Sequence, residues 1–328
     1  MTPDQLAQAL LQAVRAQQFE ATADALRGAA PLAHFPSLDL AVVAFPRGAA
    51  PVCANVLFSR EHARGIVAQI APGPGAVQNI AFVADRTDAQ GVSDAWLPDA
   101  DWAQLHFEPL AGGGPHRFVA PYPASLIKLM VAVGVARQVD AGACAWDTAV
   151  CFAGRTRSVA GWAEDMIAIS CNDATSALVA LLHAQGAIVR RGQGAAGREV
   201  RNTLHEAFAA QGLATLRLAD TRANGGWGNA AGAGVGHLQM TAWDSARLLW
   251  LLDADAPPAP WLAPGAPGLV SAAGRACLRA WLDDQALHEI LSSTALAGEP
   301  GWVPGLAAQL PARWIGTCLL YTSPSPRD

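Results

Sequence analysis

The stretch PYPASLIKLM, residues 121 to 130, contains Lys128, the one lysine among the 22 Lys and Arg residues of this 328-residue chain. Arginine stays protonated in proteins, whereas a lysine can lose its proton when burial and neighbouring charges lower its pKa. Ser125 precedes Lys128 by three positions, and residues three apart share one face of a helix. We therefore expect Ser125 and Lys128 to meet as a nucleophile and its base, since a serine hydroxyl needs a neighbouring base to become reactive.

The alternative interpretation is that Lys128 lies on a solvated helix face and that Ser125 only caps the helix. The neighbours of Lys128 favour the first interpretation, because the segment from Leu126 to Val131 is otherwise apolar and predicts a buried helix. A charged residue in a buried helix is rare unless it is paired. At the start of such a helix, backbone N–H groups near Ser125 would also stabilise an oxyanion.

A second polar pair, Ser170 and Asn172, lies in the stretch AISCNDATSALVALL, 45 residues after Ser125. Taken alone, this Ser-x-Asn pair is typical of a helix cap and turn. Combined with the Ser-x-x-Lys pair, it makes a more specific set, which offers a nucleophile, a base, a second hydroxyl and an amide. The sequence therefore predicts that the two pairs act together.

The composition predicts a globular chain of one or two domains, since 52% of its residues are hydrophobic and 15% are charged. The net charge of -5 gives no reason to expect nucleic acid or an anionic membrane as a partner. No apolar run is long enough to predict a transmembrane helix. The beginning lacks the basic start of a signal peptide and predicts an amphipathic helix with Thr2 as N-cap, which leaves the compartment unknown.

The six cysteines and eight histidines show no metal-site spacing, so we expect no metal and no other cofactor. We interpret the cysteines as small buried hydrophobes. The sequence is compatible with a disulfide between Cys144 and Cys151 and equally with two free thiols. The glycines Gly192, Gly194 and Gly197 match G-x-G-x-x-G, but they follow only a short strand-like run and predict a connection between helices rather than a dinucleotide site.

Three zones follow along the chain. Residues 1–34 are predicted to form an N-terminal helical region. Between about 38 and 120 we expect short strands separated by Gly, Pro and Asp turns, in the stretches LDLAVVAF, GIVAQIA, QNIAFVAD and AQLHFEPL. From about 125 to 293 the chain is predicted to be helical, with Asn172 opening one helix and Thr241 with Asp244 forming a capping box for another.

With these residues in view, the chain resembles the serine penicillin-recognising hydrolases, and class A β-lactamases most closely. The resemblance covers roughly 35–316 and lies in PASLIKLMVAVGVARQVDAG, GWAEDMIAISCNDATSALVALL and MTAWDSARLLWLL. It implies an α/β (α+β) fold, in which an antiparallel sheet packs with helices beside an all-helical subdomain at about 125–293. Residues 35–316 would form this hydrolase domain, and its substrate would be a β-lactam or a peptidoglycan-stem-like molecule.

The resemblance also implies roles for the four polar residues. Ser125 would attack the acyl carbon, and Lys128 would be the base or its partner. Ser170 would relay protons, and Asn172 would hold the substrate amide. The enzymes of this family usually work outside the cytoplasm.

The sequence departs from the family pattern at two places. Cys171 stands where the family usually has Asp, and we expect this to be tolerated because the middle side chain points away from substrate. The glutamate that activates the deacylating water has no counterpart between Glu206 and Glu289. Asp220 is the nearest carboxylate, Glu164 is a second candidate, and Asn224 and Asn229 are polar candidates.

The end of the chain differs in composition from the rest. Its last eleven residues, CLLYTSPSPRD, match a translated sequencing-library adapter residue for residue, and contain no alanine. The family's third motif, Lys-Thr-Gly or a close relative, cannot follow, because Lys128 is the only lysine. We therefore expect residues 317–328 to be a non-native tail and the C-terminal strands to be missing. The fragment itself would be inactive toward penicillin, and the inferred function would belong to a longer parent.

The sequence thus predicts a serine hydrolase that acts through an acyl-enzyme, with a β-lactamase as the leading case. Without the deacylating glutamate, we expect an acyl-enzyme that forms faster than it hydrolyses. The alternatives are a peptidoglycan D,D-peptidase, an esterase, or a non-catalytic penicillin-recognising protein on the same fold.

Overall fold

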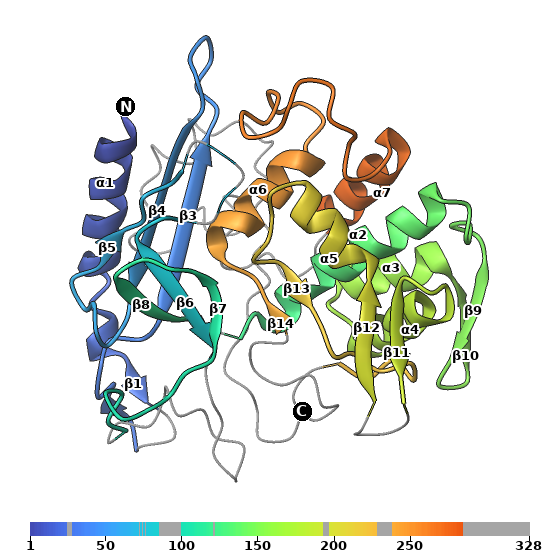
Figure 1. Ribbon diagram of the computed structural model, residues 1–328, viewed down its shortest axis with the longest axis horizontal. Helices are drawn as coiled ribbons and strands as arrows, with labels where there is room; N and C mark the ends of the chain where they lie inside the picture. The colour runs from blue at the N-terminus through green and yellow to red at the C-terminus, as the bar shows by residue number, and fades with distance from the viewer. Residues whose placement is uncertain are drawn as a thin grey trace.

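The computed structural model describes residues 1–24, 28–71, 73, 75, 77–84, 100–120, 122–192, 197–227 and 238–284. Within them the fold is mixed α+β, as predicted. Most strands and the N-terminal helix gather on one side of the molecule, and the remaining helices of the described residues gather on the other with three pairs of short strands (Figure 1). The predicted tail, residues 317–328, and the candidate Asn229 lie outside the described residues.

Two three-stranded sheets make up the strand side. In the first, β3 (Leu38–Ala44) pairs antiparallel with β4 (Val52–Phe58), and β4 pairs antiparallel with β5 (Ile66–Val67). In the second, β6 (Ile80–Ala84) pairs antiparallel with β7 (Pro109–Gly112) and parallel with β8 (His116–Ala120). The predicted strands in LDLAVVAF and QNIAFVAD are confirmed, whereas most of AQLHFEPL is not strand and β4 was not predicted.

The N-terminal helix α1 (Pro3–Ala16) begins as predicted. Thr2 accepts a hydrogen bond from the N–H of Gln5, whose side chain returns one to the Thr2 N–H, and Pro3 occupies the first turn. The apolar face of α1 packs against β4. The prediction that residues 1–34 are helical throughout is wrong, because α1 ends at Ala16 and is followed by a short 3-10 turn, η1 (Phe19–Ala21), and the strands β1 (Ala23–Asp24) and β2 (Ala30–Pro31).

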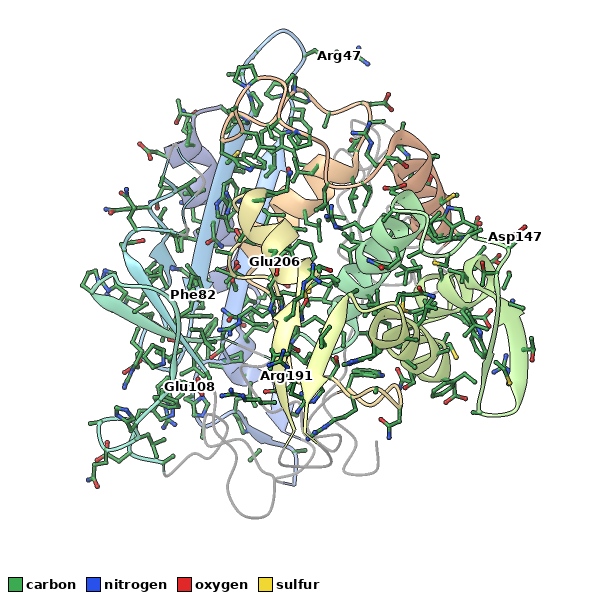
Figure 2. All side chains as sticks on the ribbon, turned by 45° about the vertical axis from the view of Figure 1, so that its right-hand side comes forward. Arg47, Phe82, Glu108, Asp147, Arg191 and Glu206 are labelled. Carbon is green, nitrogen blue, oxygen red and sulfur yellow. The ribbon has the colours of Figure 1, made fainter. Side chains whose placement is uncertain are left out.

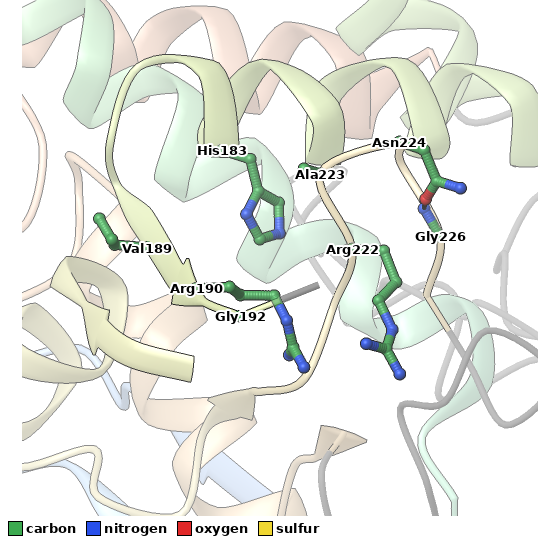
Figure 3. Close-up of a pocket in the computed structure, with 8 residues that line it drawn as sticks. All are labelled: His183, Val189, Arg190, Gly192, Arg222, Ala223, Asn224 and Gly226. Atoms are coloured by element: carbon green, nitrogen blue, oxygen red, sulfur yellow. Dashed lines mark hydrogen bonds between the residues drawn. The ribbon is translucent and has the colours of Figure 1, made fainter. Parts of the chain in front are cut away.

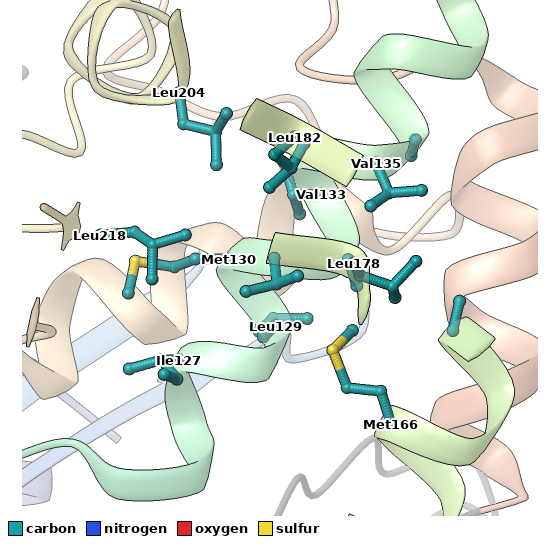
Figure 4. Packing of buried hydrophobic residues seen from close by; sticks show 14 of the residues in the cluster. Ile127, Leu129, Met130, Val133, Val135, Met166, Leu178, Leu182, Leu204 and Leu218 are labelled. Atoms are coloured by element: carbon teal, nitrogen blue, oxygen red, sulfur yellow. The ribbon is translucent and has the colours of Figure 1, made fainter. Parts of the chain in front are cut away.

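The helical side is built around α2 (Ile127–Asp140), which is buried on all sides from Ile127 to Ala136. Around it pack α3 (Val159–Ala168), α4 (Asn172–Ala184), α5 (Thr203–Ala210) and α7 (Ala272–Asp283), with α6 (Ala242–Leu252) next to the strands. Figure 4 shows leucine, valine and methionine side chains from these helices meeting around α2. Gly134 permits the contact with α5, since a Cβ there would lie 2.7 Å from Leu204 Cδ2.

The helical subdomain is not all-helical, which corrects the prediction. Its described residues contain three antiparallel strand pairs: β9 (Ala149–Phe152) with β10 (Arg155–Ser158), β11 (Ile188–Arg191) with β12 (Arg198–Asn202), and β13 (Arg217–Leu218) with β14 (Leu238–Gln239). Gly192 therefore follows β11 and Gly197 precedes β12, so these two glycines stand next to paired antiparallel strands rather than between helices. A dinucleotide site of that motif needs a strand that leads into a helix, which this strand pair does not provide.

Contacts between α6 and the strands join the strand side to the helical side. The Asp39 carboxylate on β3 accepts a hydrogen bond from the N–H of Ala242, the first residue of α6, at 2.9 Å. Trp243 of α6 packs into the apolar cluster formed by the two sheets. Charged side chains such as Arg47, Asp147 and Glu206 point outward, whereas Phe82 of β6 is buried (Figure 2).

Candidate active site

Ser125 and Lys128 are brought together at the start of α2. Ser125 belongs to a single 3-10 turn, η3 (Ala124–Leu126), which runs directly into the helix. Ala124 has a φ of 46°, a left-handed conformation that is costly for a non-glycine residue. The Lys128 side chain is fully buried, and its Nζ lies 2.9 Å from Ser125 Oγ. The expected meeting of these two side chains on one helix face is confirmed.

Ser170 and Asn172 reach the same point from the turn between α3 and α4. Ser170 has a φ of 56°, again left-handed. The turn is fixed on both sides, because the Cys171 N–H donates to Asp165 O at 3.1 Å and Thr175 Oγ1 donates to Cys171 O at 2.9 Å. The Cys171 side chain packs against the apolar core, which explains how a thiol can stand at this position.

The four side chains form one hydrogen-bonded cluster. Lys128 Nζ donates to Ser170 Oγ and Ser170 O, both at 2.7 Å, and to Asn172 Oδ1 at 2.9 Å. Ser170 Oγ in turn donates to Ser125 Oγ at 3.1 Å. Together with Ser125 Oγ, four oxygens surround a group that has only three N–H donors when it is charged. The Ser125 hydroxyl is thus close to two groups that can exchange a proton with it.

Burial lowers the pKa of Lys128 to about 8 from its ordinary value of 10.5, and a thiolate at Cys171 acts in the opposite direction. A substantial fraction of the amine is then neutral near pH 8. A neutral amine at 2.9 Å can accept the Ser125 proton, and an ammonium can return it through Ser170. The geometry and the pKa therefore suit a base that works close to neutral pH.

Trp227 lies beside this cluster, and no sequence motif indicates its role there. The centre of its ring lies 5.9 Å from Lys128 Nζ, and its Nε1 donates to Ser176 Oγ of α4 at 3.2 Å. Trp227 is separated from Lys128 by almost a hundred positions, and no periodicity links the two residues. Only the three-dimensional path of the chain beside α4 brings the ring to the lysine.

The two carboxylates predicted for deacylation are not part of the hydrogen-bonded cluster. Asp220 forms an ion pair with Arg190 at 2.8 Å, and its N–H donates to Glu199 at 3.1 Å. Glu164 is exposed on α3. Glu199, which the sequence did not single out, has its pKa raised mainly by burial.

A pocket of about 640 Å³ lies beside the far end of α4 (Figure 3). Its lining includes His183, Arg190, Arg222 and Asn224, and the two arginine side chains extend in the same direction. Arg190 is held by Asp220 and by the carbonyl of Gly197. None of the four residues of the serine–lysine cluster lines this pocket.

Within the part of the chain that the structure describes, no three His, Cys, Asp or Glu side chains are grouped so as to hold a metal ion. None of the helices in that part is long and apolar enough to cross a membrane. Cys144 and Cys151 are free thiols, so no disulfide joins them.

Comparison with protein-family models, curated proteins and solved structures finds no match for the chain. The residues of the cluster and their geometry are therefore the basis for assigning a function to this chain.

Proposed function

We propose that the protein is a serine hydrolase that works through an acyl-enzyme on β-lactams or related peptidoglycan-like amides and esters, in the manner of a class A β-lactamase. The observation that carries the proposal is the position of the buried Lys128 Nζ, 2.9 Å from Ser125 Oγ and 2.7 Å from Ser170 Oγ. The Ser-x-x-Lys and Ser-x-Asn spacings and the mixed α+β fold also support it. The finer fold assignment, a β-lactamase-like sheet with a helical subdomain, is part of the same proposal.

In the proposed reaction, neutral Lys128 takes the proton from Ser125 as Ser125 Oγ forms a bond with the acyl carbon. The electron pair of the carbonyl moves onto its oxygen and then returns as the bond to the leaving nitrogen or oxygen breaks. Ser170 passes the proton from Lys128 to the leaving group, and Asn172 binds the amide of the substrate. Water later hydrolyses the ester on Ser125 and restores the hydroxyl.

The test is covalent labelling with a fluorescent penicillin, followed by intact-mass spectrometry. Because the resemblance implies a third motif, Lys-Thr-Gly, that these residues do not contain, we would label both this chain and a longer form that supplies the motif. A labelled band that disappears in Ser125→Ala supports the proposal. A folded longer form that takes no label, or a label that persists in Ser125→Ala, contradicts it.

One observation favours a second candidate, a D,D-peptidase, an esterase or a slow penicillin binder. Asp220, the nearest carboxylate in the sequence to the missing glutamate, is bound by Arg190. An acyl-enzyme without a base for water would be long-lived. Turnover of a chromogenic β-lactam separates the candidates, since a β-lactamase hydrolyses many equivalents and a penicillin binder stops after one. A non-catalytic member of the fold would not form the adduct at all.

A further inference from the structure

Within the described part of the chain, Lys128 Nζ has no carboxylate partner. The oxygens there that accept hydrogen bonds from it belong to Ser125, Ser170 and Asn172. A buried ammonium without a counter-ion is costly, because burial favours the neutral amine. The ammonium must nevertheless form when Lys128 takes the proton of Ser125, so some other group has to stabilise it.

Trp227 is held in a fixed position beside this ammonium. Its Nε1 is bound to Ser176 Oγ at 3.2 Å. Two residues earlier, Gly225 has a φ of +89° and lies so close to α4 that a Cβ would come within 2.3 Å of Ser176 O. The turn is closed by the Arg222 N–H, which donates to Gly226 O at 2.8 Å. These contacts fasten the segment to α4 and leave the ring 5.9 Å from Lys128 Nζ.

An aromatic ring can stabilise a cation without carrying a charge. The face of an indole is electron-rich and attracts an ammonium within about 6 Å of the ring centre, more strongly when the pair is shielded from water. A carboxylate at the same place would bind the ammonium so tightly that the neutral amine would be scarce at neutral pH. A ring gives a smaller stabilisation, which leaves both protonation states accessible.

We propose that Trp227 is a positioning residue for Lys128, whose ring face stabilises the ammonium formed when the lysine takes the proton of Ser125. The catalytic part of this inference rests on the proposed function. The physical part, that the ring favours the charged form of Lys128, is independent of any substrate.

Other charged groups on the neighbouring elements are directed elsewhere. On α3, Glu164 is exposed and Asp165 binds Arg157. On α4, Asp173 is exposed, and on β13 so is Arg217. On α7, Arg279 pairs with Asp253 at 3.0 Å. Among the described residues, Cys171 is the titratable group whose charge acts on the pKa of Lys128.

The single lysine makes a direct experiment possible. Protein labelled with ¹³C at the lysine ε-carbon gives one lysine resonance, that of Lys128, because the sequence contains no other. Its shift across a pH titration reports the pKa of Lys128 without any substrate. The variants are Trp227→Leu, which removes the ring face, and Trp227→Phe, which keeps an aromatic face. Trp146→Leu is the matched control, since Trp146 packs on the same core against Trp281.

We expect Trp227→Leu to lower the pKa of Lys128 by about 0.5 to 1.5 pH units, which corresponds to the strength of a cation–π contact. Trp227→Phe should shift it by less, and Trp146→Leu should leave it unchanged. The inference is overturned if the folded leucine variant has an unchanged or raised pKa, or if leucine and phenylalanine shift it equally. Circular dichroism checks the fold, and Trp227→Met replaces the leucine variant if that one does not fold.

The two proposals can fail separately. If no penicillin label forms but the Lys128 resonance responds to Trp227 as expected, the proposed function is wrong and the ring–lysine contact stands. If the label forms but the resonance does not respond, the function stands and this inference fails. Where acylation is measurable, the acid limb of its pH profile should shift in Trp227→Leu by the same amount as the pKa.

Discussion

At the residue scale, Lys128 can accept the proton of Ser125 only when its amine is neutral. Burial lowers the pKa of Lys128 to about 8, so the fraction of Lys128 that is neutral increases as the pH rises through that value. The rate of an acylation that uses Lys128 as base is proportional to this neutral fraction. We therefore expect the acylation rate to rise about tenfold per pH unit below pH 7 and to level off above about pH 9. A stopped-flow pH profile with a chromogenic penicillin measures it, and a flat profile between pH 6 and 9 would argue against an amine base.

Lys128→Arg tests the same residue by another route. Arginine keeps a positive charge but cannot give up its proton at any ordinary pH. Acylation should fall by about 10²–10⁴-fold, the typical effect of losing a general base. The protein should still fold, which circular dichroism would show. An arginine variant that acylates at nearly the original rate would mean that the lysine serves only as a charge.

Asp220 allows a prediction about the second half of the reaction. Its carboxylate is already bound to Arg190 at 2.8 Å, and it is absent from the hydrogen-bonded cluster around Ser125. We expect Asp220→Asn to change the lifetime of the penicillin adduct by less than threefold, an effect smaller than 1 kcal/mol. Time-resolved intact-mass spectrometry measures this lifetime. A much longer-lived adduct in the variant would show that Asp220 activates the water after all.

The residues of the cluster differ in how far the sequence could predict them. Ser125 and Lys128 could be predicted because residues three apart share a helix face and Lys128 is the only lysine in the sequence. Ser170 and Asn172 could be predicted from their short Ser-x-Asn motif. Trp227 could not, because its place depends on how residues 222–227 run along α4, and long-range packing of this kind leaves no local pattern.

At the scale of elements, the turn between α3 and α4 sets the position of Ser170. Thr175, fully buried in the first turns of α4, donates its hydroxyl to Cys171 O at 2.9 Å. Valine has nearly the same shape but no hydroxyl, so Thr175→Val loosens the turn without leaving a large cavity. Cys171 O keeps its bond from the Thr175 N–H.

We expect Thr175→Val to lower stability by about 0.5–1.5 kcal/mol, the usual net value of one hydrogen bond. Acylation should fall by more than the loss of folded protein explains, because Ser170 loses its fixed distance to Lys128. Urea denaturation and the acylation rate measure the two effects. Thr175→Ser is the matched variant, since it keeps the hydroxyl and loses a methyl group. Equal acylation rates in the valine and serine variants would exclude this role for the turn.

Helix starts were predicted better than strands. Thr2 and Thr241 each cap the helix that follows, because capping is a local, short-range interaction. Asn172 is the first residue of α4 as predicted, but its side chain binds Lys128, and the N-cap Cys171 makes no side-chain capping bond. The capping box at Thr241 is only half formed, since the Asp244 carboxylate binds Thr215 and Arg247 instead of the cap. The strands β9 to β14 were missed because most of them are two to four residues long, too short for an alternating pattern to stand out.

At the scale of the whole molecule, the α+β class was expected from the family resemblance and agrees with the change of pattern near residue 120, but no sequence feature indicated the junction between the two sides. Asp39 and Ala242 are separated by 203 positions and meet at 2.9 Å. Asn55 Nδ2 donates to the other carboxylate oxygen of Asp39 at 2.7 Å. No motif predicts such a contact, because its partners lie on different elements and are ordinary in type.

This junction makes the stability of the protein depend on pH. Burial, and secondarily the nearby Asp244, raise the pKa of Asp39 to about 6 from its ordinary value of 3.8, although two hydrogen bonds act in the opposite direction. The folded protein therefore holds this proton more tightly than the unfolded chain does. The resulting stabilisation is fully present below about pH 4 and is lost as the pH rises through about 6.

Asp39→Asn should remove this dependence, because an amide does not ionise. Asp39 accepts one hydrogen bond from the Ala242 N–H and one from Asn55 Nδ2, and the single amide oxygen of the variant can keep only one of them, so the variant loses one hydrogen bond at every pH. Between pH 4 and pH 7 the free energy of unfolding of the original protein should fall by up to about 3 kcal/mol relative to that of the variant, as expected for a shift of about two pKa units.

Urea denaturation at pH 4, 5, 6 and 7 measures this difference in the free energy of unfolding. The exposed Asp147→Asn serves as control. Parallel stability profiles for Asp39→Asn and the original protein would show that the junction between β3 and α6 tolerates the charge, and that the pH dependence of the fold arises elsewhere.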